Sequence, residues 1–172
     1  MQPPARSALA RAQRSAVHLE LRDGYMLDDP GYIAWREGHR LDPADKGSWW
    51  GGWHDVVSQA VARGVVVRRA RIVSEPISDY VRYEYDGTFA NIAAGEDVRW
   101  LPRRRAKDLL VPGTDLWVFD EETVLFHYFT GDGQLAEDGR EYVSDPALAK
   151  RCADAFEAVW QRAVPHDEYR PA

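Results

Sequence analysis

The sequence predicts an α/β sandwich, in which helices cover a mixed β-sheet. Three observations predict it: helical stretches alternate with short β-branched runs, two apolar-aromatic runs joined by an acidic turn form a hairpin, and a long amphipathic helix closes the chain. The 172 residues, of which 45% are hydrophobic and 12% aromatic, supply one core in one ordinary domain. We find no internal repeat and no second domain.

The N-terminal part is expected to contain a tail and a first strand. Residues 1–15 are rich in Ala, Arg, Ser and Pro, and we expect a flexible or weakly helical tail there, followed by a single α/β domain at 16–172. The segment 16–22 alternates apolar and polar residues, which predicts a half-buried strand or an extended arm. Its apolar positions are Val17, Leu19 and Leu21.

Two helices are expected next. Asp29 precedes Pro30 and predicts the cap of a short helix that carries aromatic residues inward. The turn-rich segment 38–47 predicts a surface loop. Ser48 can cap a second helix, which Gly64 ends in the left-handed conformation. The apolar residues that recur along it at helical spacing are Trp49, Trp50, Trp53, Val56, Val57, Ala60 and Val61.

The middle of the chain alternates strands with one helix. The β-branched run 65–73 predicts an interior strand of a covered sheet, with arginines emerging toward its far end. Pro76 opens a predicted helix, and 96–101 is a short predicted strand. The segment 112–126 predicts a hairpin with an exposed acidic turn, followed by a second turn at 130–133.

The last element has the clearest pattern. Ser144 is the predicted cap of a helix over 145–164. One face of this helix is apolar and consists of Leu148, Cys152, Ala155, Phe156, Val159 and Ala163. Cys152 is the only cysteine, so it excludes an internal disulfide framework. Its place on the apolar face predicts inert packing rather than a nucleophile.

Composition excludes several functional classes. The formal net charge of −6 argues against a general nucleic-acid binder, although 65–72 and 99–107 are locally basic. Nucleic-acid binding through 99–107 is also disfavoured because no recognition-helix motif is evident. The first residues lack the apolar region of a secretory signal, and no apolar run approaches the roughly 20 residues that span a bilayer. We therefore expect a cytoplasmic protein without a membrane segment.

Four stretches carry a family resemblance. They are "RGVVVRRARIVSEPISDYVRYEY", "AAGEDVRWLPRR", "DLWVFDEETVLFHYFTGDG" and "DPALAKRCADAFEAVWQRAVPHDEYRP". Together, over most of 16–171, they resemble an actinobacterial family of small uncharacterised proteins, a domain of unknown function. At the level of the fold the chain also resembles one half of the phospholipase D superfamily. There a helix ending in Gly leads into a "GVxVRV" strand, a later hairpin carries the active residues, and a helix with a terminal Trp closes the unit.

The resemblance implies a test of catalysis. Catalysis in that superfamily needs a His nucleophile, a Lys two residues on, and an acidic residue five further along. If Asp120 is the acidic residue, the His place falls on Gly113 and the Lys place on Asp115. If Glu121 or Glu122 is the acidic residue, these places fall on Thr114 and Leu116, or on Asp115 and Trp117. No His-x-Lys occurs in the chain, so we expect a degenerate phospholipase-D-like fold, a pseudoenzyme without phosphodiesterase activity.

The arginines are the candidate ligand residues. Ligands of open α/β sheets gather beyond the carboxyl ends of strands, and guanidinium groups suit phosphate or carboxylate. The predicted anion site consists of Arg71, Ser74, Glu75, Arg99 and Arg103. The alternative is an internal salt-bridge network in which carboxylates such as Glu75 and Asp120 neutralise the arginines. This alternative is slightly favoured.

Other sites are less supported. Trp50 lies about 100° round the predicted helix from Trp49 and Trp53, so it is the candidate for a partner surface. The favoured alternative is that the three Trp side chains pack in the core. The pairs His54–Asp55 and His166–Asp167 are read as surface residues. No zinc, calcium, P-loop or dinucleotide motif is present, so no metal or cofactor is expected.

These observations favour a non-enzymatic, cytoplasmic regulatory or interaction protein that acts through a protein partner or a bound small anion. The family resemblance implies a regulatory role, because similar proteins accompany helix-turn-helix regulators and degenerate phospholipase-D-like folds serve as sensor domains. A helix-turn-helix regulator is therefore the candidate partner, and self-association stays open. The alternative is a hydrolase or transferase that uses an Arg-rich pocket at the sheet rim with Glu75 or Asp120.

Overall fold

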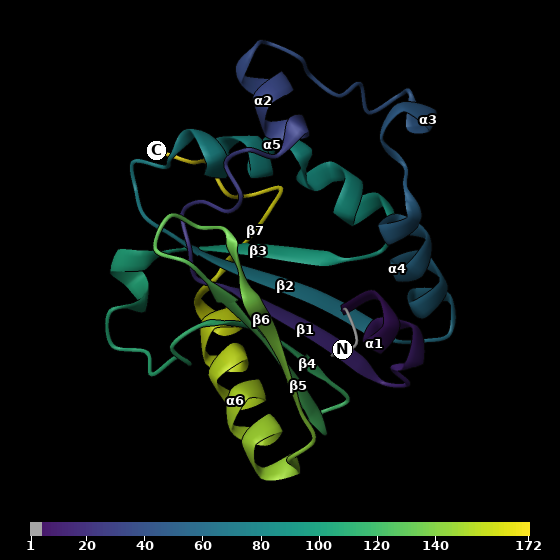
Figure 1. Ribbon diagram of the computed structural model, residues 1–172, viewed down its shortest axis with the longest axis vertical. Helices are drawn as coiled ribbons and strands as arrows, with labels where there is room; N and C mark the ends of the chain where they lie inside the picture. Colours follow the sequence, from purple (N-terminus) through teal and green to yellow (C-terminus); the bar gives the residue numbers. More distant parts are fainter. Residues whose placement is uncertain (1–4) are drawn as a thin grey trace.

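The computed structural model describes residues 5–172 and has a seven-stranded mixed sheet with the strand order β6-β5-β4-β1-β2-β3-β7 (Figure 1). The predicted α/β fold is confirmed. The elements are α1 (Ala5–Arg11), β1 (Ser15–Glu20), α2 (Pro30–Arg36), α3 (Lys46–Trp49), α4 (Gly52–Ala62), β2 (Val66–Val73), α5 (Asp79–Ala93), β3 (Asp97–Pro102), the 3-10 helix η1 (Arg103–Ala106), β4 (Asp115–Phe119), β5 (Thr123–Phe129), β6 (Leu135–Val143), α6 (Pro146–Arg162) and β7 (Val164–Pro165).

The sheet is parallel in its centre and antiparallel on both sides. β2 pairs in parallel with β1 and with β3, whereas β4, β5, β6 and β7 join antiparallel. The registers place Glu20 opposite Arg71 across β1 and β2, and Arg71 opposite Trp100 across β2 and β3. Side chains opposite each other share one face of the sheet, so this register decides which charges meet.

One face of the sheet packs mainly on α6, and Ala106, Leu109 and Val111 pack against the same cluster. Asp145 caps this helix by accepting hydrogen bonds from the backbone N–H groups of Ala147 and Leu148, and Pro146 occupies the first turn. Ser144 was the predicted cap, and the actual cap is one residue later. Five of the six predicted stripe residues pack in this core, whereas Ala155 does not; Ala149, Ala153 and Trp160 pack there in addition. Phe156, Val159 and Cys152 are buried against strand residues that include Leu19, Ile72, Leu101 and Leu116.

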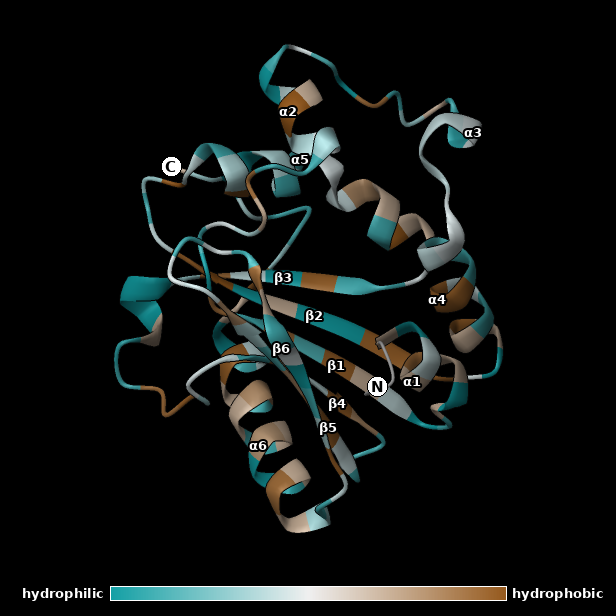
Figure 2. Ribbon diagram, viewed as in Figure 1, coloured by the Kyte–Doolittle hydropathy of each residue, from teal (hydrophilic) through white to brown (hydrophobic). Residues whose placement is uncertain are grey.

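The other face carries two separate apolar clusters. α1 and α4 cover one of them, around Trp117 and Phe119, while α5 and the C-terminal segment cover the other, around Trp100 and Val98. Hydrophilic residues lie between the two clusters, and Figure 2 shows this as a hydrophilic stretch within β2. The central strand β1 is consequently buried on both faces. The predicted half-buried strand was wrong in this respect, because His18 and Glu20 are also buried.

The N-terminal prediction needs correction. A flexible or weakly helical tail was expected over 1–15; α1 spans Ala5–Arg11 and its Leu9 is fully buried, so residues 5–11 form a packed helix. Ala8 and Ala12 pack in the same cluster, so the ordered fold begins before residue 16. Residues 1–4 lie outside the described part of the chain. Arg63 of the α4 C-terminus donates hydrogen bonds to the carbonyl oxygens of Leu9, Ala10 and Ala12.

The structure differs from the sequence prediction in three further elements. The helix expected from Ser48 is broken between α3 and α4, because Trp50 and Gly51 are extended and α4 begins at Gly52. The helix expected from Pro76 begins at Asp79 and is capped by Ser78. β6 was not predicted. The structure confirms five other predictions: the cap at Asp29, the left-handed exit at Gly64, the surface loop before α3, the hairpin and the turn at 130–133. Within residues 5–172 no helix is long and apolar enough to cross a membrane.

Candidate functional site

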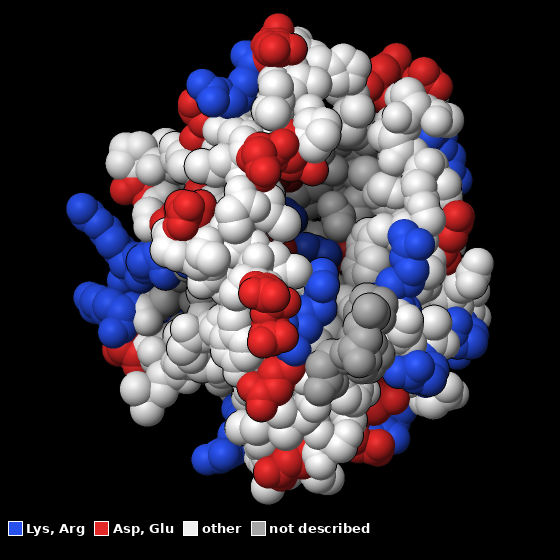
Figure 3. Space-filling view, in the orientation of Figure 1, with Lys and Arg blue, Asp and Glu red and all other residues white. Residues whose placement is uncertain are grey.

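The charged part of the sheet lies at the bottom of a hollow. α4 covers the start of β2 and α5 packs on β3, so the middle of β1 and β2 stays open between the two helices. Figure 3 shows this hollow, with Lys or Arg atoms and Asp or Glu atoms at its floor. β1 and β2 contribute four buried polar side chains on this face: His18, Glu20, Arg69 and Arg71.

Glu20 holds both arginines. Its Oε1 accepts a hydrogen bond from Nη1 of Arg69 at 2.5 Å, and its Oε2 accepts one from Nε of Arg71, also at 2.5 Å. The side chains are 8%, 10% and 6% exposed, respectively. Because a buried charge must be paired, Glu20 and the two guanidinium groups depend on one another.

Helix α5 and its exit complete the network. Nε of Arg69 donates to Glu96 at 2.5 Å, and Asn91 donates to the other oxygen of Glu96 at 2.9 Å. Nη1 of Arg71 donates to the hydroxyl of Thr88 at 2.7 Å, and Thr88 in turn donates to the backbone oxygen of Glu84. The spacing of Glu84, Thr88 and Asn91 places them on one face of α5. The helix therefore presents a polar face to the arginines.

The carboxyl groups of this network have opposite pKa shifts. Burial favours the neutral form of Glu20, but Arg71 and Arg69 outweigh it and lower the pKa of Glu20 far below its usual range. Burial raises the pKa of Glu84 to about 8, and the charge on Glu20 adds to the shift while Arg71 opposes it. Glu84 lies 3.9 Å from Nε of Arg71, too far for a hydrogen bond. Burial and the charge on Glu20 therefore favour the protonated form of Glu84.

Each arginine keeps one terminal nitrogen that the network does not use. Hydrogen bonds engage Nε and Nη1 of both Arg69 and Arg71. Within residues 5–172 no hydrogen bond engages Nη2 of either residue. Arg69 also lies over Trp117, and Arg71 lies over Trp100 at 4.8 Å from the ring centroid. Aromatic packing thus fixes the planes of both guanidinium groups.

Two histidines border the network. His18 stacks on Trp117 with ring centroids 4.3 Å apart, and its Nδ1 lies 3.5 Å from Glu20. Burial, reinforced by Arg69, lowers the pKa of His18 well below its usual value. His127 lies edge-on to His18, and burial lowers its pKa to about 4. Nδ1 of His18 and Nε2 of His127 are buried without a hydrogen-bond partner among the described residues.

Asp115 lies beside the network at the start of β4. The hydroxyl of Tyr25 and the backbone N–H of Leu21 both donate to its carboxylate. Burial raises the pKa of Asp115 to about 6, although the hydrogen bond from Tyr25 opposes this shift. Asp115 is therefore a buried carboxyl group that a phenol hydroxyl binds.

The residues predicted as an anion site do not all converge. Arg71 lies in the network described above. Arg99 lies on the opposite face, opposite Ala70, where it stacks over Trp160 at 4.3 Å and donates to the backbone oxygen of Trp160. The expected convergence of Arg71 and Arg99 on one rim is therefore wrong. Successive side chains of a strand point to opposite faces of the sheet. Trp100 pairs with Arg71 and shares its face, so Arg99, one residue earlier, lies on the opposite face.

Ser74, Glu75 and Arg103 do share a rim pocket of about 280 Å³ with Pro102 and Arg104. Nε of Arg103 donates to the hydroxyl of Ser74 at 3.1 Å. Asp23 accepts from the backbone N–H and the hydroxyl of Ser74, at 2.7 and 2.6 Å, and lies 3.6 Å from Arg103. The carboxylate of Asp23 is therefore already the negatively charged partner of Ser74 and Arg103 at this rim. Glu75 accepts from Tyr169.

The remaining candidates have structural contacts. Trp50 is half-buried, donates from Nε1 to Asp55 at 2.7 Å, and packs under the ammonium of Lys46. Asp120, in the turn of the predicted hairpin, accepts hydrogen bonds from the backbone N–H groups of Gln13, Arg14 and Ser15. It therefore fastens the chain between α1 and β1 and lies in neither the network nor the rim pocket.

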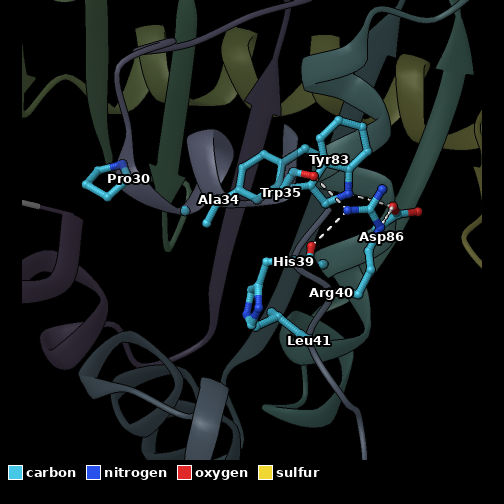
Figure 4. A pocket seen from close by; sticks show the side chains of 10 residues that line it. Pro30, Ala34, Trp35, His39, Arg40, Leu41, Tyr83 and Asp86 are labelled. Carbon is cyan, nitrogen blue, oxygen red and sulfur yellow. Dashed lines mark hydrogen bonds and ion pairs between the residues drawn. The ribbon is translucent and has the colours of Figure 1, made fainter. Parts of the chain in front are cut away.

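A second cavity of about 370 Å³ lies between α2, α5 and the segment 39–41 (Figure 4). Trp35, Tyr83 and Leu41 supply large apolar surfaces, and Arg40 and Asp86 lie at its edge. Nη1 of Arg40 donates to the backbone oxygens of Trp35 and His39, at 2.7 and 2.8 Å. The full lining consists of Pro30, Gly31, Ala34, Trp35, His39, Arg40, Leu41, Tyr83, Asp86 and Gly87.

Comparison with known proteins places the chain in a family. The model of the family described as "Domain of unknown function (DUF6879)" matches residues 4–171. The chain belongs to this family. No curated protein matches the sequence. Among the described residues no group of three or more His, Cys, Asp or Glu is arranged to hold a metal ion.

Two solved structures share the fold of this family member. Nuc of Salmonella typhimurium, a phospholipase D family member, superposes with a TM-score of 0.54 at 14% identity, covering 96% of this chain and 88% of that one. NucT of Helicobacter pylori superposes with a TM-score of 0.52 at 10% identity, covering 93% and 87%. The predicted likeness to the phospholipase D fold is confirmed. At these identities the likeness concerns the fold alone.

Proposed function

We propose that this DUF6879 protein is a non-enzymatic binding protein that takes a small anion in the hollow above β1 and β2. The observation that carries the proposal is the pair of unused Nη2 groups on Arg69 and Arg71. A phosphate or carboxylate oxygen can accept a hydrogen bond from each. The planes of both groups are already fixed, so little further ordering opposes binding.

The charge of the network supports an anionic ligand. Two guanidinium groups face the carboxylates of Glu20 and Glu96, so these four charges cancel. Glu84 adds no negative charge while it is protonated, and its carboxyl O–H is a further donor. An incoming anion would therefore meet donors in a site of balanced charge.

The absence of a His-x-Lys motif supports a binding role over phosphodiester hydrolysis. If Asp120 is the acidic residue, the places of the nucleophile and the phosphate-binding Lys fall on Gly113 and Asp115. A carboxylate at the second place would repel a phosphodiester rather than stabilise it. The regulatory role extends the proposal: anion binding would change the affinity for a protein partner in the cytoplasm. The likeness of the motifs to actinobacterial proteins makes a helix-turn-helix regulator the first partner to test.

Thermal unfolding at fixed ionic strength tests the binding proposal. Inorganic phosphate, a nucleotide and a dicarboxylate are each added at ten times the measured dissociation constant, where a bound ligand adds about 1.4 kcal/mol and raises the Tm by roughly 3–5 °C. Arg71→Lys should abolish the shift, because one ammonium cannot bond Glu20, Thr88 and an anion in a single plane. Arg68→Lys is the matched control, because Arg68 pairs with Glu157 on the α6 face. An equal shift in both variants would contradict the proposal.

A hydrolase or transferase in the same hollow is the second candidate. The observation that favours it is that the pKa values of Glu84, His18 and Asp115 are all shifted from their usual values. Such groups can donate and accept protons near pH 7. Turnover of phosphate esters or carboxylate esters by pure protein distinguishes the two roles. Turnover that Glu84→Gln abolishes would favour the enzyme, while a thermal shift without turnover favours the binding protein.

A further inference from the structure

The cavity between α2 and α5 is independent of the charged hollow. Tyr83, Asp86 and Gly87 line it from α5, whereas Glu84 and Thr88 turn toward the sheet. We infer that this cavity binds a planar aromatic molecule that carries a short anionic arm. Its volume of about 370 Å³ lies within the range of small-molecule sites, roughly 300–1,000 Å³, and exceeds that of a two-ring compound.

Gly87 supplies the first argument, because it keeps space open at a cost to the helix. It lies inside the 15-residue helix α5, where Gly is about 1 kcal/mol less favourable than Ala. A Cβ added at Gly87 would meet no heavy atom within 4 Å, so close packing does not require the glycine. Its backbone does not have the positive φ that favours glycine either. What the glycine provides is room in the cavity that it lines.

Trp35 supplies the second argument, because it is a fixed aromatic wall. Its Nε1 donates to Asp86 at 2.8 Å, and the guanidinium of Arg40 lies 4.5 Å from its ring centroid. Tyr83 stands at 60° to Trp35 with centroids 6.2 Å apart. Two rings held at this angle suit a flat aromatic ligand, which can stack on one and meet the other edge-on. Figure 4 shows the side chains around the space.

The edge of the cavity decides the charge of the ligand. Asp86 already accepts from Trp35 and lies 3.7 Å from Nε of Arg40, so its carboxylate is engaged. Arg40 donates from Nη1 to two backbone oxygens, and within residues 5–172 no hydrogen bond engages its Nη2. The Arg40 side chain is 52% exposed. The free group at the edge is thus a cationic donor, which suits a carboxylate or another single negative charge.

Three probes with one ring and different charges test the inference: indole, indole-3-acetate and indole-3-ethylamine. Ligand-observed NMR titration of wild-type protein should give saturable binding of indole-3-acetate with a dissociation constant on the order of 0.1–1 mM, as expected for a molecule of this size. Indole should bind several-fold more weakly, and the amine should bind weakest. Failure of every probe to bind saturably would overturn the inference, as would preference for the amine.

Variants assign the binding to this cavity. Gly87→Leu fills the space and should weaken indole-3-acetate binding at least tenfold, while Gly87→Ala should leave a folded and more stable protein with a smaller loss. Gly51→Leu is the matched control, because a Cβ there also meets nothing within 4 Å and Gly51 lies outside the cavity. Arg40→Gln should weaken indole-3-acetate about fivefold and leave indole within twofold. Unchanged affinity in Gly87→Leu would place the binding elsewhere and overturn the inference.

Discussion

Arg71 lies directly opposite Glu20 in the parallel pair of β2 and β1, and its Nε donates to Glu20 Oε2 at 2.5 Å. Arg71 was a candidate anion ligand on sequence grounds, with an internal salt bridge as the slightly favoured alternative. The contact with Glu20 satisfies one side of the guanidinium and leaves Nη2 uncommitted. The two interpretations are therefore compatible in this residue, because an internal carboxylate positions the donor that an anion would use.

The first prediction concerns this ion pair. Arg71→Ala should lower the free energy of unfolding by about 3–5 kcal/mol, because it leaves Glu20 buried with one guanidinium instead of two. Urea unfolding with and without phosphate measures the effect. Arg82 lies in α5 outside the network, and Arg82→Ala should change the free energy of unfolding by less than about 0.5 kcal/mol. A loss below 1 kcal/mol for Arg71→Ala would contradict the proposed dependence.

The sequence predicts the apolar part of this fold better than the charged part. β2, β3, the hairpin and α6 have clear periodicity or β-branched runs, and all four are present. β6 was missed because its sequence "LAEDGREYV" carries the charges that protect an edge strand. α1 was expected only as a flexible or weakly helical tail, because seven Ala-rich residues give little periodicity and packing on α4 supplies its stability.

The site was harder to predict for a tertiary reason. Alternating charges in "HLE" and "RRAR" are typical of a solvent-facing strand, so Glu20 and Arg69 gave no signal of burial. Their burial is tertiary: Arg69 pairs with Glu96, which follows α5, and Glu84 and Thr88 of α5 face Arg71. The one available signal was that 16–22 holds a single acid, Glu20, while 65–73 holds three arginines. Using it required the pairing register of β1 and β2, which the sequence does not give.

The second prediction concerns Asp120. Its carboxylate accepts from the backbone N–H groups of Gln13, Arg14 and Ser15, and these bonds lower its pKa although partial burial opposes them. Asp120→Ala should lower the free energy of unfolding by about 1–3 kcal/mol, because three backbone N–H groups lose a charged acceptor, although Gln13 and Arg14 are exposed and water can partly replace it. Hydrogen exchange should accelerate at those three amides. Glu121→Ala in the same turn is the control and should leave their exchange unchanged.

The third prediction concerns the α6 core. Phe156 is fully buried, and Phe156→Ala should cost about 3–5 kcal/mol in chemical unfolding. Arg151→Ala, on the exposed side of the same helix, should cost less than about 0.5 kcal/mol. Burial also raises the pKa of the Cys152 thiol, so native protein should react slowly with a thiol reagent. Rapid labelling of Cys152 before unfolding would show that the helix does not cover it.

The last prediction is the pH dependence that Glu84 imposes. Its pKa is about 8 in the folded protein and about 4.5 in the unfolded chain, so between these values the folded state holds one proton more. The free energy of unfolding should therefore fall as the pH rises, by at most about 1.4 kcal/mol per pH unit, and level off above pH 8. Asp115 contributes in the same direction, but only below about pH 6.

The window from pH 7.2 to 8.2 isolates this effect. Burial lowers the pKa of His18, His127 and His166, and these groups act in the opposite direction. Because half of the unfolded imidazoles still hold a proton at about pH 6.5, their influence becomes small only above about pH 7.2. Unfolding in urea at pH 7.2, 7.7 and 8.2 should show the fall in wild type and a nearly flat profile in Glu84→Gln, since an amide does not ionise. Glu137→Gln, an exposed control, should keep the wild-type slope. A flat wild-type profile, or a slope that Glu84→Gln retains, would show that Glu84 is ionised in the folded protein. Glu84 would then add a negative charge beside Arg71, and the balanced charge on which anion binding depends would be lost.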